Sequence, residues 1–231
     1  MLILGIDTTA VTASAAIAEI DKTVKTYSLF TVKNRLTHSE ILMPMINQAF
    51  ELYGAKPSEL SLIAVSAGPG SFTGVRIGVS TVKGLAMGIG KQIPCAAVST
   101  IEALAQNLSG RDGVICPVMD ARRNQFYNAL FQDEKRLCDD RLISAGELSE
   151  QLTRYDKAVT LCGDGADLFY SLCKDSSNMI VASPSSKDQN ALSVALCGYR
   201  ALLENRTFTP KELKPIYLRA SQAERERNGL E

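Results

Sequence analysis

Two strand ends in this chain each bring a carboxylate into a turn, an arrangement typical of phosphate chemistry. Residues 2–7 form an apolar run that ends in Asp7 and is followed by Thr8 and Thr9, and residues 114–120 form a second run that ends in Asp120. Such a turn can hold phosphates through backbone amides while the carboxylate orients a metal ion or a water. The same residues also cap turns within a protein, and spacing alone favours that structural interpretation.

A glycine-rich stretch at 66–86 is the most unusual segment of the chain. It predicts a buried strand, a tight turn at Gly68-Pro69-Gly70 and then a helix, because apolar residues after Gly70 recur at helical spacing. A Walker A loop would need lysine where Val75 stands, and the third glycine of a GxGxxG pattern comes one place late. What remains is a helix N-terminus, which is a generic anion site.

The glycines inside this predicted helix need a physical reason. Gly74, Gly78 and Gly84 each cost about 1 kcal/mol relative to alanine in a helix interior. A helix carries that cost where another backbone or a ligand approaches closely. The approaching group can belong to the fold itself or to a ligand or partner, and the sequence leaves both open.

Few residues are available for metal or nucleophile chemistry. The single histidine, His38, falls in the first turn of a helix predicted over 37–53, where it reads as a surface or capping residue. The six cysteines include no CxxC pair, so we expect free, buried thiols. No metal site is predicted.

The composition bounds the class of protein. The 231 residues are 45% apolar and 22% charged, as in an ordinary globular chain. Lys and Arg number 25 and so do Asp and Glu, which argues against a broad nucleic-acid surface but allows a local patch. No apolar run approaches the roughly 18 residues of a membrane span, and Asp7 interrupts the N-terminal run. We therefore expect a cytoplasmic protein without membrane contact.

The remaining pattern predicts an α/β protein with a weak internal repeat. Three strands open the chain, and the segment 109–113 is the best domain boundary. After it the order strand, Asp, turn, strand returns at Asp120, with strands expected over 125–132 and 136–143. This repeat predicts two lobes of related topology.

Several strings together resemble the TsaB (YeaZ) family over the whole length of the chain. They are IDTT at 6–9, GPGSFTGVRIG at 68–78, MDARRNQFY at 119–127 and PIYLR at 215–219. The resemblance implies a two-lobed, actin-like and Hsp70-like (ASKHA) fold in which each lobe is a mixed sheet flanked by helices. The lobes would span 1–109 and 110–186, a helix at 190–204 would return to the first lobe, and 205–231 would form an extended tail.

The resemblance also implies a function in tRNA modification. Members of the family pair with the catalytic subunit TsaD and act with TsaE in N6-threonylcarbamoylation of adenosine 37 in tRNAs that read codons beginning with A. The metal-binding HxxxH of TsaD would fall on Thr100 and Leu104, and neither replaces an imidazole ligand. We therefore expect a non-catalytic scaffold, a pseudoenzyme with no intrinsic cofactor, that reaches tRNA through the complex and homodimerises alone.

Two sets of site residues follow from the turns and from the resemblance. Weak binding of ATP or ADP would use Asp7, Thr8, Thr9, Gly68, Gly70, Gly163 and Gly165. Contact with TsaD would use the glycine-bearing helix and an exposed apolar side of the preceding helix, with His38, Leu42, Met45, Ile46, Gly74, Arg76 and Gly78 as candidates.

Other functions compete with the scaffold. A nucleotide-dependent ATPase or kinase-like enzyme of the same fold would use Asp7 or Asp120 as a metal-orienting or general-base carboxylate. A metallopeptidase is less favoured, because one histidine without a ligand cluster is too few. A module that only binds RNA is disfavoured by the neutral charge, and any tRNA contact should come from Arg122, Arg123 or the segment 225–227.

Overall fold

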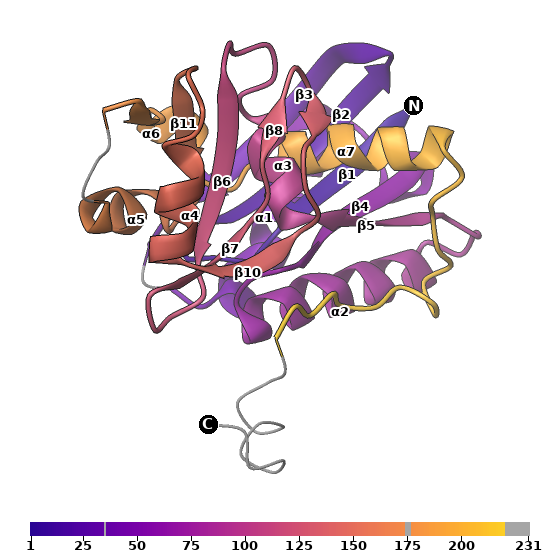
Figure 1. Cartoon of the computed structure of the whole chain (residues 1–231). Helices are drawn as coiled ribbons and strands as arrows, with labels where there is room; N and C mark the ends of the chain where they lie inside the picture. The colour runs from indigo at the N-terminus through magenta and orange to yellow at the C-terminus, as the bar shows by residue number, and fades with distance from the viewer. Residues whose placement is uncertain (35, 174–176, 220–231) are drawn as a thin grey trace.

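Two sheets with the same strand order form the frame of the molecule (Figure 1). The computed structural model describes residues 1–34, 36–173 and 177–219. The first sheet has the order β3-β2-β1-β4-β5 and the second the order β10-β7-β6-β11-β12, with β8 and β9 beside β6. In each, the central strand is antiparallel to the next strand in sequence and parallel to its other neighbour. The expected repeat and the mixed α/β fold are confirmed.

The helices and strands fall into two lobes along the chain. The first lobe contains β1 (Leu2–Asp7), β2 (Ala13–Asp21), β3 (Thr23–Val32), α1 (His38–Tyr53), η1 (Pro57–Glu59), β4 (Leu62–Gly68), α2 (Phe72–Gly88), β5 (Cys95–Ser99) and α3 (Thr100–Gln106). The second contains β6 (Val114–Asp120), β7 (Gln125–Asn128), β8 (Phe131–Gln132), β9 (Lys135–Arg136), β10 (Arg141–Ser144), α4 (Ala145–Leu152), β11 (Val159–Cys162), α5 (Ala166–Leu172) and β12 (Met179–Val181). The chain continues into α6 (Pro184–Lys187) and α7 (Ala191–Leu203).

Helices cover both faces of the first sheet. On one face α1 and α2 bury apolar side chains against β1 and β4, and on the other α7 packs across β1, β2 and β4 (Figure 1). Burial on both faces explains why β1 and β4 are continuous apolar runs rather than alternating ones. Gly5 in β1 lets α7 approach, because a Cβ there would lie 2.1 Å from the Ala191 carbonyl oxygen.

Helix α1 starts where its capping residues dictate. Thr37 is the N-cap, and its backbone N–H donates to Glu40 Oε2 at 2.9 Å in a capping box. Gly54 ends the helix in the left-handed conformation at φ 79°, which glycine adopts without a Cβ clash. The helix runs through Pro44, close to the predicted bounds of 37–53.

The second sheet differs from expectation at two places. The strand expected over 125–132 is two strands, β7 and β8, and the one expected over 136–143 is β9 and β10. Strand β6 pairs with β8 up to Ile115 and with β7 from Val118. Pro117 lies at the change and has no N–H for a ladder, and the buried Asn128 side chain donates to its carbonyl at 2.8 Å. The antiparallel pairing of β6 therefore changes from β8 to β7 at Pro117, and the Asn128 side chain satisfies the carbonyl oxygen of Pro117.

The lobes share an apolar core around α3. Ile101 and Leu104 of this helix are buried with Ile115 and Met119 of β6. This packing closes the molecule behind the turns that end β1 and β6. None of the helices in the described residues is long and apolar enough to cross a membrane.

Candidate functional site in the cleft between the lobes

The turns that follow β1 and β6 meet at a cavity of about 480 Å³ between the lobes. The first lobe contributes Thr9 and Gly70, and the second contributes Asp120 and Asp164. The remaining lining residues are Ala10, Val11, Ser71, Met119, Ala121, Arg122 and Tyr127. Of the residues expected to bind nucleotide, the cavity brings together Thr9 and Gly70, and Asp7, Thr8, Gly68, Gly163 and Gly165 lie outside its lining.

Asp7 is used inside its own turn. Its Oδ1 accepts hydrogen bonds from the Thr9 backbone N–H at 2.9 Å and the Thr9 hydroxyl at 2.7 Å, and its Oδ2 accepts one from the Ser66 hydroxyl at 2.5 Å. The side chain is 1% exposed, and desolvation raises the pKa of the carboxyl although these hydrogen bonds oppose the shift. The structure therefore supports the turn-capping interpretation of Asp7, because both of its carboxylate oxygens accept hydrogen bonds from within the fold.

The glycine-rich stretch packs against the same turn. A Cβ on Gly70 would lie 2.5 Å from the Thr9 carbonyl oxygen, and one on Gly74 would lie 2.0 Å from that of Thr8. A Cβ on Gly78 would lie 2.7 Å from the Thr8 hydroxyl oxygen, which donates to the Gly74 carbonyl at 2.8 Å. For Gly74 and Gly78 the approaching group belongs to the fold itself. It is the Thr8 backbone at Gly74, and the side chains of Thr8 and Val65 at Gly78. Both glycines are buried, so their expected contact with a partner is wrong.

The turn after β6 is built differently from the turn after β1. Arg122, Arg123 and Asn124 all have positive φ, at 66°, 57° and 54°. A single non-glycine residue in this region costs about 1 kcal/mol or more, so three in succession make a strained turn. Asp120 holds it by accepting from the Arg122 backbone N–H at 2.7 Å and from its guanidinium at 3.1 Å. The exposed side chains of Arg122 and Arg123 extend from this turn, and Arg122 lines the cavity.

Asp164 supplies the second carboxylate of the cavity. It follows β11, in the turn whose flanking glycines were expected to bind nucleotide. Desolvation, with a smaller contribution from the Asp120 carboxylate, raises the pKa of Asp164 from 3.8 to about 6. Gly163 and Gly165 themselves pack on β6, since a Cβ on them would lie 2.3 Å from the Val118 carbonyl oxygen and 2.8 Å from the Asp120 nitrogen. Their role is close packing within the lobe.

Comparison with known proteins identifies the family of the chain. The family model for TsaD, tRNA N6-adenosine threonylcarbamoyltransferase, matches residues 33–225. The tRNA threonylcarbamoyladenosine biosynthesis protein TsaB of Bacillus subtilis is 33% identical over 230 residues, which are 97% of this chain and 96% of that protein. The chain belongs to the TsaB family.

Further relatives extend the same result. TsaB of Escherichia coli is 26% identical over 242 aligned residues and is covered over its full length, as is this chain. The structure of YeaZ from Pseudomonas aeruginosa superposes with a TM-score of 0.75 at 20% identity, over 94% of this chain and 99% of that one. The ethanolamine utilization protein EutJ from Carboxydothermus hydrogenoformans matches at a TM-score of 0.50 and 13% identity, over 86% and 89% of the two chains, and shows the wider actin-like fold.

The partner face expected for this TsaB-family chain needs correction on α1. Leu42, Met45 and Ile46 are 1%, 6% and 1% exposed and belong to the core between α1 and the first sheet. Helical periodicity identifies these three residues as one apolar face, but it does not show whether the chain's own sheet covers that face. His38 is half-buried, and its Nε2 donates to the Ala10 carbonyl at 2.6 Å.

The C-terminal segment of this TsaB-family chain docks on the glycine-rich stretch, which sequence reasoning missed. The Ile216 N–H donates to the Ala67 carbonyl at 2.7 Å, and a Cβ on Gly68 would lie 2.2 Å from the Ile216 carbonyl oxygen. Tyr217 stacks on Phe72 with ring centroids 4.4 Å apart. In the sequence, GPGSFTGVRIG and PIYLR are both family-like strings. No spacing rule predicts that two segments so far apart in the chain contact each other.

Two arginines complete this docking. The Arg76 guanidinium lies 4.0 Å from the centroid of the Phe72 ring, and its Nε donates to the Tyr217 hydroxyl at 3.0 Å. Arg219 reaches the other lobe and donates to the Ala121 carbonyl at 3.1 Å. The segment 213–219 thus connects α2 to the strained turn beside the cavity. Residues 220–231, which include the predicted contacts at 225–227, lie outside the described residues.

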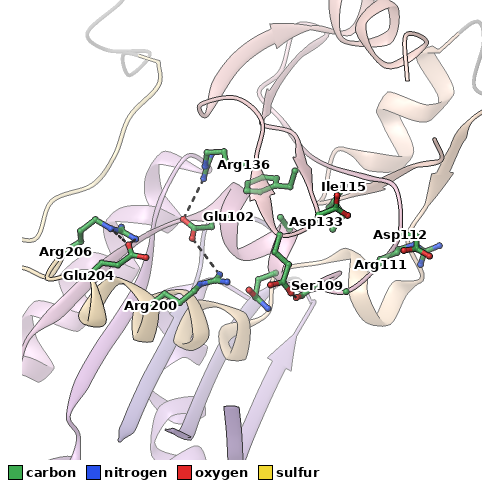
Figure 2. A pocket seen from close by; sticks show the side chains of 15 residues that line it. Glu102, Ser109, Arg111, Asp112, Ile115, Asp133, Arg136, Arg200, Glu204 and Arg206 are labelled. Atoms are coloured by element: carbon green, nitrogen blue, oxygen red, sulfur yellow. Dashed lines mark hydrogen bonds and ion pairs between the residues drawn. The ribbon is translucent and has the colours of Figure 1, made fainter. Parts of the chain in front are cut away.

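A second cavity of about 490 Å³ lies on another side of the lobe junction (Figure 2). Figure 2 shows Glu102 of α3 between Arg136 of β9 and Arg200 of α7, with ion pairs of 3.7 and 3.8 Å. At its edge Arg206 pairs with Glu204. Carboxylates of the chain therefore neutralise the guanidinium groups of Arg136, Arg200 and Arg206. We interpret the ion pairs at this cavity as a network that links the lobes.

Proposed function

We propose that this chain is a non-catalytic scaffold subunit that pairs with TsaD in the biosynthesis of threonylcarbamoyladenosine on tRNA. Its family membership supports the pathway, since its relatives from Bacillus subtilis and Escherichia coli carry that function in their names. The observation that carries the scaffold role is the state of Asp7: its carboxylate is buried and hydrogen-bonded to Thr9 and Ser66. Both oxygens of this carboxylate are engaged within the fold, which supports a structural role for Asp7 over one in orienting a metal ion or a water.

The positions that would match the metal ligands of TsaD support the same proposal. Thr100 and Leu104 lie on α3 and are buried, with Leu104 in the apolar core between the lobes. Within the described residues no group of three or more His, Cys, Asp or Glu side chains is placed to hold a metal ion. Transfer chemistry would then belong to TsaD, and this chain would hold TsaD in its active arrangement.

The partner face we propose is the outer side of α1 and of the C-terminal half of α2. Met43 on α1 is 39% exposed and Met87 on α2 is 70% exposed. Gly84 is exposed and a Cβ there would meet nothing within 4 Å, so its helical cost is not explained by packing in the chain. A flexible methionine and an open glycine together suit the close approach of a partner helix.

The test is reconstitution from separately purified components. The chain and TsaD are mixed, run on gel filtration, and assayed for modification of an unmodified tRNA in the presence of TsaE and a supply of threonylcarbamoyl-adenylate. A complex should form, and modification should depend on this chain. Met87→Asp should prevent assembly, while Leu203→Asp, at an equally exposed position on α7, should not. Modification that is independent of the chain would refute the proposal.

One observation favours a nucleotide-dependent enzyme as a second candidate. Asp120 and Asp164 both line the cavity between the lobes, so two carboxylates face the space where a nucleotide would bind in this fold. Steady ATP turnover by the purified chain, abolished by Asp120→Asn and kept in Glu150→Gln on α4, would establish that activity. Absence of turnover by the chain, together with dependence of TsaD on it, would leave the scaffold.

A further inference from the structure

Five cationic side chains lie on three segments that contact one another beside the cavity between the lobes, and Arg122 also lines that cavity. We define the basic strip as Arg76, Arg122, Arg123, Lys214 and Arg219. Contacts between its segments make it continuous: Arg76 binds the Tyr217 hydroxyl at 3.0 Å, and Arg219 binds the Ala121 carbonyl at 3.1 Å. The strip therefore runs from the N-terminal end of α2 across the docked segment 213–219 to the strained turn after β6.

The local charge of this strip departs from that of the whole chain. Positive and negative side chains balance at 25 each over the full sequence. The three segments that form the strip, 69–76, 121–125 and 213–219, contain five cations and no acidic residue. Of the acidic residues beside these segments, Asp120 already pairs with Arg122 and Asp164 lines the cavity. Glu212 precedes the docked segment and accepts hydrogen bonds from Thr209. The neutral total thus conceals a local positive surface.

Two guanidinium groups of the strip, those of Arg122 and Arg123, are exposed to a ligand. The Arg122 side chain is 86% exposed even though it touches Asp120. Arg123 is exposed, and within the described residues it forms no ion pair. The positive φ angles at these residues hold both side chains at the tip of the turn. Tyr217 accepts a hydrogen bond from Arg76 and stacks on Phe72, yet it is still 42% exposed.

We propose that the basic strip binds the sugar–phosphate backbone of RNA, and this inference rests on the proposed function because tRNA is the substrate there. Four of its five cations are arginines, whose planar guanidinium groups bind phosphate oxygens in pairs. An exposed aromatic ring among cations is the usual composition of a surface for unpaired nucleotides. The strip lies at the opposite end of α2 from Gly84 and Met87, so RNA and TsaD would occupy separate surfaces.

The test measures equilibrium binding of an unmodified tRNA to the reconstituted complex over a range of salt concentrations. The variant Arg122→Gln/Arg123→Gln removes two guanidinium groups from the strip, and Lys214→Gln removes one ammonium. Arg154→Gln is the matched control, because its guanidinium is 71% exposed and lies near α4, away from the strip. Gel filtration checks that every variant still assembles.

Each lost phosphate contact lowers the slope of log affinity against log salt by about 0.7 to 0.9. The double variant should therefore lower that slope by about 1.4 to 1.8 and bind roughly 25- to 60-fold more weakly at 0.1 M salt. Lys214→Gln should lower the slope by about half as much, and the control should overlay the parent.

Three outcomes would overturn the inference. The double variant could bind tRNA with the parent's affinity and slope, or the control could lose as much as the double variant. The double variant could also fail to assemble with TsaD, which would make the strip a protein interface instead. A modification assay on the same preparations separates the two proposals. If TsaD modifies tRNA without this chain, the proposed function fails. If an assembled double variant binds tRNA as the parent does, only the proposal of the basic strip is refuted.

Discussion

The contact between the glycine-rich helix and the turn after β1 predicts that Gly74→Ala destabilises the protein. A Cβ at position 74 would lie 2.0 Å from the carbonyl oxygen of Thr8 and 3.1 Å from its carbonyl carbon. Both atoms belong to the backbone of a buried turn that Asp7 holds through two hydrogen bonds to Thr9. If the Thr8 carbonyl group moved away from a methyl group at position 74, the turn would shift and the hydrogen bonds between Asp7 and Thr9 would be disturbed.

Opposing effects set the size of the change. Alanine improves helix propensity by about 1 kcal/mol over glycine. Forcing a methyl group into a packed interior costs typically about 1 to 3 kcal/mol. The Thr8 hydroxyl also donates to the Gly74 carbonyl at 2.8 Å, and losing this bond costs about 1 kcal/mol more. We therefore expect Gly74→Ala to lower the free energy of unfolding by about 1 to 3 kcal/mol.

Gly84→Ala on the same helix is the matched control. A Cβ at position 84 would meet nothing within 4 Å, so only helix propensity changes, and the free energy of unfolding should rise by about 1 kcal/mol. Urea denaturation followed by circular dichroism measures both variants, and an unchanged m-value shows that the midpoints report stability. If Gly74→Ala stabilised the protein as much as Gly84→Ala does, close approach of the Thr8 carbonyl would not explain the glycine.

Three more predictions concern other parts of the chain. Tyr217→Ala should lower the free energy of unfolding by about 1 to 2 kcal/mol, since it removes the stack on Phe72 and the bond from Arg76, and Tyr217→Phe should cost less than half of that in the same urea assay. The pKa of Asp164 is raised from 3.8 to about 6, so ionisation of its carboxyl lowers the free energy of unfolding at neutral and basic pH. Asp164→Asn should therefore be more stable than the parent at pH 8. Urea titrations should show this difference in stability shrinking as the pH falls and vanishing below about pH 4. Burial raises the pKa of Cys95 to about 11 and that of Cys197 to about 12, so iodoacetamide at pH 8 should leave both unlabelled in the native protein and label them in urea, as read by mass spectrometry.

The fold could be predicted from the sequence wherever one local rule was enough. The run that ends in Asp7 and the run that ends in Asp120 predicted the duplicated lobes, because an apolar strand with a polar turn is a local signal. The 125–132 strand was wrong because a single buried residue, Asn128, satisfies the carbonyl of Pro117 where the pairing changes. That interaction depends on tertiary position, and no periodicity encodes it.

The candidate site was harder to predict than the fold. Helical spacing identified Leu42, Met45 and Ile46 as one face, but it could not tell a face against the chain's own sheet from a face left for a partner. The docking of Tyr217 on Phe72 joins residues far apart in sequence, and no spacing rule connects them. Asp164 was missed, because only the glycines on either side of it were expected to bind a ligand. It lies near Asp120 because the parallel strands β6 and β11 place their carboxyl ends at one edge of the sheet.

The glycine-rich stretch resembles a phosphate loop because packing against a turn and packing against a phosphate make the same demand on a helix. Both need positions without a Cβ near the helix N-terminus. Here Gly70 and Gly74 face the carbonyl oxygens of Thr9 and Thr8, and Gly68 faces that of Ile216. Carbonyl oxygens at these positions would repel a phosphate rather than bind it. Packing within the chain therefore explains Gly68, Gly70 and Gly74. A nucleotide in the adjoining cavity would face the carboxylates of Asp120 and Asp164, so we expect a cation to accompany it.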